Sequence, residues 1–413
     1  MLLPAEMNEA TRLFVREHAG DDVRQLALRG SKDADVDLPL ALQQIQGWQT
    51  ARRKLPSWAA VEGLLYPPHL SMEQCSSEAT ARYKAAVVEA LVNNRQSLVN
   101  NRQPFVDYRQ TLVDLTGGFG VDFAFLAPLF SERIYVEQQS SLFAIASQNF
   151  STLGLTAATV NADAADYLKR IDKASLIFLD PARRDSRGGR TYGIADCQPN
   201  ILEMKDELLA KSDFVMLKLS PMLDWRKAVS DLGHELVEQV HIVSVGNECK
   251  ELLVVLSGKG SDAPCLCCVD DGQVERFRLS EDSSDSVGYA DGDLRGRYLC
   301  EPNASLMKAG RFAELAVRYG VKPLARNSHL FVADEVNAQF PGRRFRITAV
   351  STLNKHALRQ TVSPLRQANI SVRNFPMGVD ELRRRLKLRE GGSNYVFATT
   401  LATGEKILIV ATR

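Results

Sequence analysis

The chain has 413 residues, of which 45% are hydrophobic and 24% are charged, and its formal net charge is only +1. That length and composition are typical of a folded protein with room for two or three domains. No apolar run approaches the roughly 20 residues of a membrane helix, and the N-terminus lacks a secretory h-region, so we expect a cytoplasmic protein without membrane segments.

The first hundred residues carry the pattern of helices. In the segments 7–19 and 41–55, apolar residues recur at the spacing of one helix face. A further helix is expected over 79–92 (ATARYKAAVVEALV), with Ser76 or Ser77 as its N-cap. This part of the chain therefore predicts a helical N-terminal region.

From Thr111 the pattern changes to short apolar strands separated by helical stretches. The expected strands are TLVDL, RIYVE, AATVN, SLIFLD, DFVMLKL, EQVHIVSV and ELLVVLS. The first five predict a parallel sheet covered by helices on both faces, and the last two flank a short polar turn and predict an antiparallel hairpin. The sequence thus predicts an α/β fold with a seven-stranded doubly wound sheet in which one strand is reversed.

Beyond residue 260 the elements become shorter and the charge changes sign. A small hairpin is expected over 265–279, and from Arg344 the order is strand, helix, strand, helix, hairpin. Residues 301–413 contain 19 Lys and Arg against 8 Asp and Glu, a net +11, whereas the other 300 residues carry a net −10. This asymmetry predicts a polyanionic partner, most often a nucleic acid, with a solvated basic surface as the alternative.

The seven cysteines are scattered without a disulfide framework, which suits a reducing compartment. Cys265, Cys267 and Cys268 form a local cluster but lack a second ligand pair at the spacing of a zinc finger. We therefore expect no metal site.

The motif TLVDLTGGFGVD, residues 111–122, joins a buried strand to a helix through three glycines. Glycine backbone can pass close beneath a ligand and adopt positive φ, and the amides of the following helix favour a negative group. No Gly-Lys-Ser/Thr follows, and Phe123 stands where a dinucleotide fingerprint has its third glycine. The motif predicts a nucleotide-like cofactor other than a dinucleotide.

Three acids follow three successive strands of the expected sheet. Asp114 directly precedes the glycine turn, where a carboxylate suits the cationic amino-acid end of S-adenosylmethionine better than a diphosphate. Glu137 ends the second strand and can accept both ribose hydroxyls, and Asp163 is positioned for the adenine amino group. Any one of them can be a strand-end cap, but together they predict an S-adenosylmethionine site.

The fourth strand ends in FLDPARRD, at the edge of the sheet where the ligand crevice of such folds lies. Asp180 and the carbonyl of Pro181 can hold the N–H of an acceptor amine and orient its lone pair, although Asp-Pro is also a common turn. Lys218, at the end of the fifth strand, can also approach the crevice.

These motifs resemble those of class I S-adenosylmethionine-dependent methyltransferases, in the order DLTGGFGVD, VEQ, NADA and LDPARR. Residues 66–257 resemble RNA-type members that carry an Asp-Pro-Pro-aromatic or related tetrapeptide. The segments FRITAVSTLNKHALRQ, ISVRNFP and GVDELRRRLKLREGGSNYVFAT resemble the THUMP-like domain of bacterial enzymes of this group. The resemblance implies a Rossmann-like methyltransferase domain over 101–260, a helical N-terminal region over 1–100, a small ferredoxin-like α+β domain over 261–340 and a THUMP-like domain over 341–413.

Carried over by position, the resemblance implies a cofactor site and an acceptor site. The cofactor site comprises Asp114, Thr116, Gly117, Gly118, Gly120, Glu137, Asp163 and Ala164, and the acceptor site comprises Asp180, Pro181, Ala182 and Arg183. Ala182 and Arg183 replace the usual Pro-aromatic pair, so base stacking must come from elsewhere or from the Arg183 guanidinium. A cytosine-C5 mechanism needs a cysteine in this loop, and Cys197 lies well downstream.

We therefore expect an S-adenosylmethionine-dependent methyltransferase that acts on a base amine of RNA, such as rRNA or tRNA. Expected RNA contacts in the basic tail are Arg373, Phe375, Arg383, Arg384, Arg385 and Lys387, the last four on a helix over 378–390. The alternatives are an RNA-binding or scaffolding protein with a catalytically inactive methyltransferase fold and, less favoured, a nicotinamide-dependent oxidoreductase.

Overall fold

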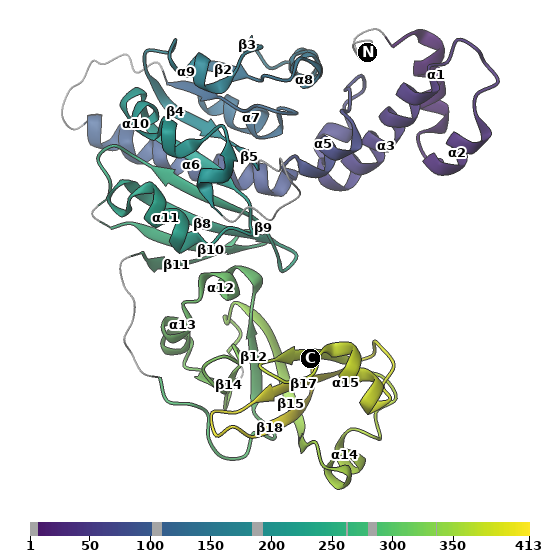
Figure 1. Ribbon diagram of the computed structural model, residues 1–413, viewed down its shortest axis with the longest axis vertical. Coiled ribbons are helices and arrows are strands. Elements are labelled where there is room, and N and C mark those ends of the chain that lie inside the picture. The colour runs from purple at the N-terminus through teal and green to yellow at the C-terminus, as the bar shows by residue number, and fades with distance from the viewer. Residues whose placement is uncertain (1–6, 101–109, 184–192, 262, 280–286, 336) are drawn as a thin grey trace. The chain divides into compact units, whose positions relative to one another are not determined.

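The computed structural model describes residues 7–100, 110–183, 193–261, 263–279, 287–335 and 337–413. The chain forms two compact units, one of residues 1–245 and 250–265 and the other of residues 246–249 and 266–413 (Figure 1). Among the helices in the described ranges, none combines the length and the apolarity needed to cross a bilayer.

The N-terminal region is helical, as the sequence predicts. Its helices are α1 (Glu9–His18), α2 (Val23–Arg29), α3 (Leu38–Lys54), α4 (Pro56–Ala59), α5 (His69–Gln74) and α6 (Glu78–Asn100). The Asp22 and Asp37 side chains cap α2 and α3 by accepting backbone N–H groups. The hydroxyl of Ser77 accepts the Thr80 N–H at 3.2 Å, so Ser77 is the cap that starts α6.

The larger of the two main sheets is doubly wound. Its strands are β1 (Thr111–Asp114), β2 (Glu132–Val136), β3 (Ala158–Val160), β4 (Ala174–Leu179), β7 (Ser212–Leu219), β8 (Val237–Val245) and β9 (Glu248–Leu256). The intervening helices are α7 (Val121–Leu126), α8 (Ser140–Thr152), α9 (Ala164–Leu168), α10 (Ile201–Lys211) and α11 (Trp225–Leu232). The first five strands pair in parallel, and β9 runs antiparallel to β7, which confirms the predicted reversed strand.

The sheet is larger than the sequence predicts. It has nine strands in the order β11-β10-β8-β9-β7-β4-β1-β2-β3, where seven were expected. The additional strands are β10 (Cys265–Asp270) and β11 (Gln273–Arg278), the segment expected to be a separate small hairpin. The sequence reveals the hairpin, but it does not reveal which sheet edge the hairpin joins.

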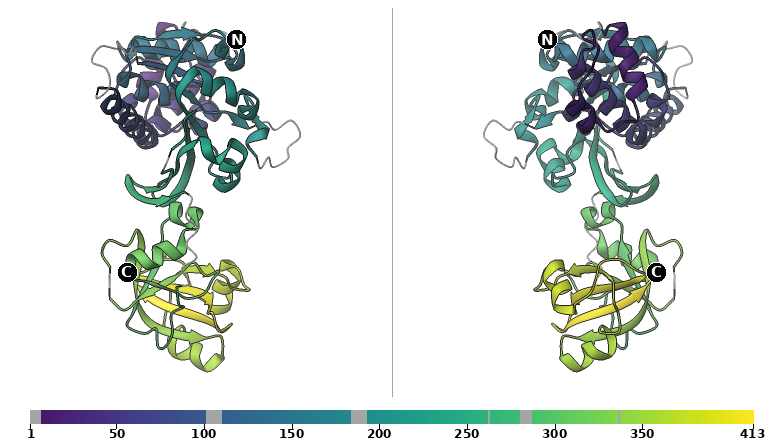
Figure 2. Two further views of the ribbon diagram at one scale, coloured as in Figure 1. Left: turned by 90° about the vertical axis from the view of Figure 1, so that its left-hand side faces the viewer. Right: turned by 90° about the vertical axis from the view of Figure 1, so that its right-hand side faces the viewer.

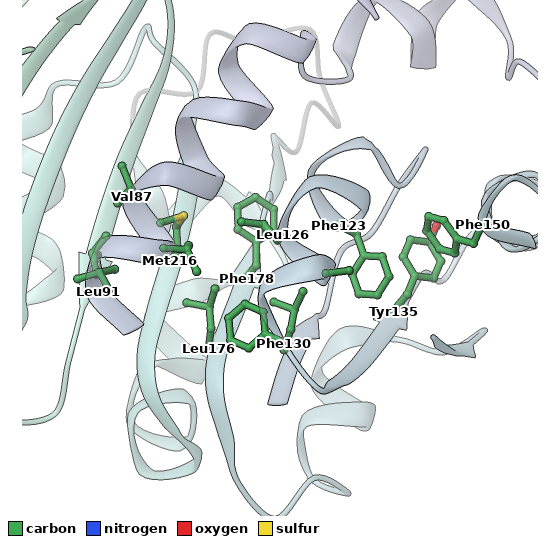
Figure 3. Packing of buried hydrophobic residues seen from close by; sticks show 14 of the residues in the cluster. Val87, Leu91, Phe123, Leu126, Phe130, Tyr135, Phe150, Leu176, Phe178 and Met216 are labelled. Atoms are coloured by element: carbon green, nitrogen blue, oxygen red, sulfur yellow. The ribbon is translucent and has the colours of Figure 1, made fainter. Parts of the chain in front are cut away.

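The strand order reverses at β1, which has β2 on one side and β4 on the other. In doubly wound folds this point opens a crevice at the carboxyl ends of the strands. A buried apolar cluster fills the sheet face beneath α6, α7 and α8 (Figure 3). Phe123 packs there against Tyr135 and Phe150, with ring centroids 5.5 and 5.2 Å away, which explains why a phenylalanine occupies the position of a third glycine.

The N-terminal helices pack against the glycine turn and the helices α7 and α8 of the first unit (Figure 2, purple and blue). Trp58 and Tyr66 share a buried cluster with Phe119 and Val121, which flank the glycine turn. The N-terminal region is therefore part of the same compact unit as the sheet.

The second unit contains a seven-stranded sheet in the order β13-β14-β12-β15-β18-β17-β16. Its strands are β12 (Tyr298–Pro302), β13 (Lys322–Pro323), β14 (Phe331–Ala333), β15 (Gly342–Thr352), β16 (Asn369–Arg373), β17 (Asn394–Thr400) and β18 (Lys406–Thr412). Its helices are α12 (Ala304–Ala309), α13 (Phe312–Tyr319), α14 (Lys355–Thr361) and α15 (Val379–Leu386). Because β12 pairs with β15, the two small regions expected on either side of residue 341 share one sheet.

Candidate active site

A cavity of about 970 Å³ lies at the carboxyl ends of β1, β4 and β7, at the reversal of strand order. Its walls come from the glycine turn, from the ends of these strands and from β9. The N-terminal region adds a wall through Leu70, Ser71 and the segment 74–76. All of the predicted cofactor residues thus line one cavity, together with Asp180, Pro181 and Ala182.

The three glycines of the turn serve different purposes. A Cβ on Gly117 would come within 2.0 Å of the Tyr135 ring, and one on Gly120 would lie 2.7 Å from Phe150. Gly118 has φ +56°, and a Cβ added there would meet no atom closer than Thr116 O at 3.9 Å. Packing therefore requires Gly117 and Gly120, and positive φ favours glycine at both Gly118 and Gly120, the latter with φ +85°.

Asp114 is the most buried acid of the cofactor wall, with a relative exposure of 1%. Its carboxylate accepts the Thr116 N–H at 3.0 Å. Burial raises the pKa of Asp114 well above its ordinary value, and the negative charges of Asp122, Asp180 and Glu137 raise it further. The ionised form of Asp114 therefore favours a cationic ligand.

Glu137 follows β2 and holds the glycine turn. Its two carboxylate oxygens accept the N–H of Gly118 at 2.8 Å and that of Gln139 at 2.6 Å. Each oxygen keeps a further lone pair for a ligand hydroxyl. Asp163 caps α9 by accepting the N–H groups of Ala165 and Asp166. It also lines the cavity, so it is a helix cap that lies at the predicted position.

Asp180 lies at the end of β4 and is fixed from two directions. Its backbone N–H donates to Thr116 Oγ1 at 2.6 Å, which ties the acceptor loop to the glycine turn. Lys218 Nζ, at the end of β7, contacts Asp180 Oδ2 at 2.5 Å. Lys218 is thus brought to the crevice, with a side chain that is 10% exposed, instead of reaching toward solvent.

A buried charge network continues from Lys218 along the wall of the cavity to Lys84 on α6. Asp122 Oδ2 lies 3.6 Å from Lys218 Nζ and accepts the hydroxyl of Ser76 at 2.7 Å. Lys84, on α6, lies 3.1 Å from Asp122 Oδ1 and binds both carboxylate oxygens of Glu251 at 2.6 and 2.7 Å. Burial alone would raise the pKa of Asp122, but Lys84 and Lys218 hold it below its ordinary value.

Sequence reasoning assigned no role to Asp122, Lys84 or Glu251. One signal was available, because Lys84 lies on the apolar face of α6 with Ala81, Val88 and Leu91, where a fully buried lysine needs a partner. No pattern along the chain indicates that this partner is a glutamate 167 residues away.

Cys197 is closer to the acceptor loop than its sequence position suggests. It lies in β6 (Cys197–Gln198), which pairs with β5 (Ala182–Arg183), and it lines the cavity. The prediction that Cys197 lies too far downstream to act in the acceptor loop was therefore wrong, because the chain returns to the loop through β6. The side chain of Arg183 lies outside the described residues, so its predicted stacking role stays a prediction.

In the basic tail, three of the expected RNA contacts, Arg373, Phe375 and Arg383, have structural partners. Arg373 contacts the buried Glu301 at 3.1 Å, and Phe375 packs against an apolar cluster of the second unit. Arg383 is half-buried and donates to the Ala368 carbonyl, whereas Arg384 and Arg385 are exposed. The helix expected over 378–390 ends earlier, at Leu386, because Lys387 adopts φ +56° as its left-handed cap.

The cavity fits S-adenosylmethionine. Among the ion pairs that the described residues form, none neutralises Asp114 or Glu137, so a sulfonium or ammonium ligand would meet uncompensated negative charge there. The open face of Gly118 allows a ligand to lie against the backbone of the turn. Fold and site together define a class I methyltransferase, with the ligand held at the switch point of a doubly wound sheet.

Comparison with known proteins agrees with this class. A crystal structure of a protein from Porphyromonas gingivalis W83, described as a methyltransferase, is 31% identical and superposes with a TM-score of 0.83, covering 100% of this chain and 99% of that one. An uncharacterized S-adenosylmethionine-dependent methyltransferase of Mycobacterium tuberculosis is 26% identical over 295 residues, which are 70% of this chain and 77% of the relative. Residues 298–341 match a ferredoxin-like domain family, and residues 342–413 match a THUMP domain-like family.

The chain therefore belongs to the family of S-adenosylmethionine-dependent methyltransferases that carry a ferredoxin-like and a THUMP-like region at the C-terminus. It is an enzyme, and S-adenosylmethionine is its cofactor.

Proposed function

We propose that this methyltransferase transfers its methyl group to an amine of an RNA base. The observation that carries the proposal is Asp180, whose side chain is 38% exposed at the cavity while Lys218 holds one of its oxygens. The other oxygen is available to accept an N–H from the methyl acceptor. A carboxylate in this position orients an amine without having to act as a strong base.

The remaining steps follow from what each group can do. Asp114, Glu137 and the glycine turn would hold S-adenosylmethionine, which would supply a methyl group on a positively charged sulfur; as the N–C bond to the acceptor forms, the S–C bond breaks and S-adenosylhomocysteine leaves. Asp180 Oδ1 and the Pro181 carbonyl hold the acceptor N–H groups, so that the nitrogen lone pair is aligned for transfer. Asp180 can take the surplus proton once the nitrogen carries the methyl group.

The mouth of the cavity supports a planar, uncharged acceptor. Leu70 and Met222 both line the cavity, and they are 67% and 77% exposed. They come from α5 and from the loop after β7, and exposed apolar side chains of this size favour contact with a ligand or partner. Together they offer a nucleobase the apolar contact that an aromatic residue provides in related motifs.

RNA as the carrier of the base is supported by the C-terminal region. Its THUMP-like part and its net charge of +11 over residues 301–413 are suited to a polyanion. The cavity is instead rich in acids, so phosphates are expected to stay outside while the base enters.

The proposal is tested with purified protein, labelled S-adenosylmethionine and total RNA from a strain that lacks the gene. Label is expected in RNA, and nucleoside digestion is expected to yield a base methylated on an amine nitrogen. Asp180→Asn is expected to lower the rate at least about tenfold, because the amide presents one fewer acceptor oxygen and pairs less strongly with Lys218.

A different product would overturn the amine assignment. Because Cys197 lines the cavity, 5-methylcytidine together with loss of activity in Cys197→Ser would identify a covalent cytosine mechanism instead. Label that resists RNase digestion would exclude RNA as the acceptor.

A further inference from the structure

The charge network around Lys218 is a costly arrangement for a structural element. Lys84 is 0% exposed, and the side chains of Asp122 and Glu251 are 9% and 4% exposed. Buried ion pairs often stabilise a fold no better than apolar residues of the same volume. A purely structural reason for keeping five charges here is therefore weak.

The members of the network differ in their exposure to solvent. Lys84 is fully buried, the side chains of Asp122, Glu251 and Lys218 line the cavity with at most 10% exposure, and Asp180 is the most exposed of the five at 38%. Five elements contribute one group each: α6, α7, β9, β7 and the end of β4. The charges thus connect the packed interior to Asp180, the most exposed carboxylate of the network.

Lys218 links Asp180 to Asp122 and so to the rest of the network. Its Nζ lies 2.5 Å from Asp180 Oδ2 and 3.6 Å from Asp122 Oδ2. Burial alone would lower the pKa of Lys218, but the carboxylates of Asp180, Asp122 and Glu251 raise it above its ordinary value, so the ammonium stays charged at every pH the enzyme meets. The charged ammonium of Lys218, which Asp122 holds in place, can therefore fix the carboxylate of Asp180.

We infer that Lys218 is a positioning residue for methyl transfer, and that Asp122, Lys84 and Glu251 hold it in place. Lys218 binds Asp180 Oδ2 while Thr116 binds the Asp180 backbone N–H, so both ends of the residue are fixed. Asp180 Oδ1 then points one lone pair at the acceptor without sampling other rotamers. This inference rests on the proposed role of Asp180 but does not depend on the acceptor being RNA.

The alignment argument predicts a loss of rate without a loss of cofactor binding. A misplacement of about 1 Å can cost about 100-fold in rate. In Lys218→Met, methyl transfer at saturating S-adenosylmethionine is expected to fall about 100-fold, while the Kd for S-adenosylmethionine stays within about threefold of wild type. Lys218→Arg keeps the charge and is expected to restore at least about a tenth of the wild-type rate.

A matched control is available on α11. Lys227 is 60% exposed and pairs with Asp231 at 3.0 Å, so Lys227→Met makes the same chemical change away from the cavity. It is expected to leave both the rate and the Kd unchanged. Wild-type transfer in Lys218→Met, or a parallel loss of rate and cofactor affinity, would overturn the inference.

Thermal melting decides whether Lys218→Met folds. If it does not, Asp122→Asn replaces it, since this change removes the charge that anchors Lys218 and keeps the side-chain shape. Its expected result is a roughly tenfold lower rate at unchanged Kd, and a wild-type rate would count against the anchor.

The acceptor in these assays is unfractionated extract from a strain lacking the gene, with and without RNase treatment. If the wild-type enzyme labels RNase-resistant material, the RNA proposal fails, yet the comparison between Lys218→Met and Lys227→Met still tests the positioning role.

Discussion

At the scale of the residue, Asp114 is a buried acid that we propose binds a cationic ligand, and burial of its carboxylate affects stability. Its raised pKa means that the folded, ligand-free protein holds the proton more tightly than the unfolded chain does. Stability therefore falls as pH rises from the ordinary aspartate pKa through the raised one. A cationic ligand reverses this penalty by favouring the ionised carboxylate.

Asp114→Asn is accordingly expected to weaken S-adenosylmethionine binding about 10- to 100-fold, the loss of about 1.5 to 3 kcal/mol for a charge-assisted contact. The ligand-free variant is expected to be as stable as wild type or more so at neutral pH. Calorimetric binding and urea denaturation measure the two quantities, and a binding constant equal to wild type would contradict the assignment.

The same residue predicts a pH dependence. Wild-type affinity for S-adenosylmethionine is expected to fall as pH drops through the raised pKa of Asp114, because the protonated carboxyl no longer attracts a cation. That slope is expected to be absent in Asp114→Asn. An identical pH profile in the two proteins would assign the titration to another group.

Gly117 and Gly118 are both glycine for different reasons, which are side-chain packing at Gly117 and backbone conformation at Gly118. In Gly117→Ala the new methyl group meets the Tyr135 ring, which its hydroxyl fixes to the Gly118 carbonyl at 2.5 Å, so at least about 2 kcal/mol of stability is expected to be lost. Gly118→Ala meets no atom and is expected to lose about 1 kcal/mol through its positive φ alone. Denaturant titration compares them, and equal losses would contradict the distinction.

The apolar mouth of the cavity is tested by shortening Leu70 and Met222 together to alanine. Each side chain contributes about 1 kcal/mol if the acceptor base covers it in part. The KM for RNA is therefore expected to rise about 10- to 30-fold, with the Kd for S-adenosylmethionine unchanged. The exposed Leu28 on α2, which is 88% exposed, supplies the control, since Leu28→Ala should alter neither value.

At the scale of the element, α15 shows how a short basic helix divides its arginines. Asp380 and Glu381 occupy its first turn, and Arg383, Arg384 and Arg385 occupy its last turn, an arrangement that complements the helix dipole. Leu382 is buried beneath the helix, and Arg383 lies partly along the same face. Arg384 and Arg385 are therefore the arginines of this helix that solvent, or RNA, can reach.

Replacing Arg384 and Arg385 by alanine is expected to weaken RNA binding and to reduce the slope of log K against log salt by up to about two, one for each lost phosphate contact. Filter binding at several salt concentrations measures the slope. The double change Arg24→Ala and Arg29→Ala, on the exposed side of α2, is the control. An unchanged slope would remove α15 from the RNA surface.

At the scale of the whole molecule, the second unit is held together across the boundary between its two family matches. Glu301, on β12, is 3% exposed and contacts Arg343 on β15 at 2.5 Å and Arg373 on β16 at 3.1 Å. The ferredoxin-like and THUMP-like segments therefore share both a sheet and a buried charge. They are expected to unfold together.

Glu301→Gln tests this coupling. Removing one partner of a fully buried pair costs about 3 to 5 kcal/mol, but the two arginines are 40% and 38% exposed and can regain water, so about 2 kcal/mol is expected. Glu390→Gln, whose side chain is 83% exposed, is the control. Loss of structure confined to residues 298–341, seen by hydrogen exchange, would contradict a shared unit.

Local patterns in the sequence were sufficient to predict most of the elements and the cofactor wall. Period-two and helical spacing, the glycine turn and the strand-end acids are local signals, and parallel strands necessarily bring their carboxyl ends to one edge. For this reason the positions of Asp114, Glu137 and Asp180 around one cavity could be anticipated from the sequence.

The tertiary structure decided what depends on contacts between distant segments. Lys84 meets Glu251 across 167 residues, Lys218 meets Asp180 across 38, and Cys197 returns to the acceptor loop through β6. Such contacts leave no spacing in the sequence because packing, and not local conformation, creates them. The sequence by itself determined that this protein holds S-adenosylmethionine, and the tertiary structure decided which buried charges lie around the Asp180 carboxylate.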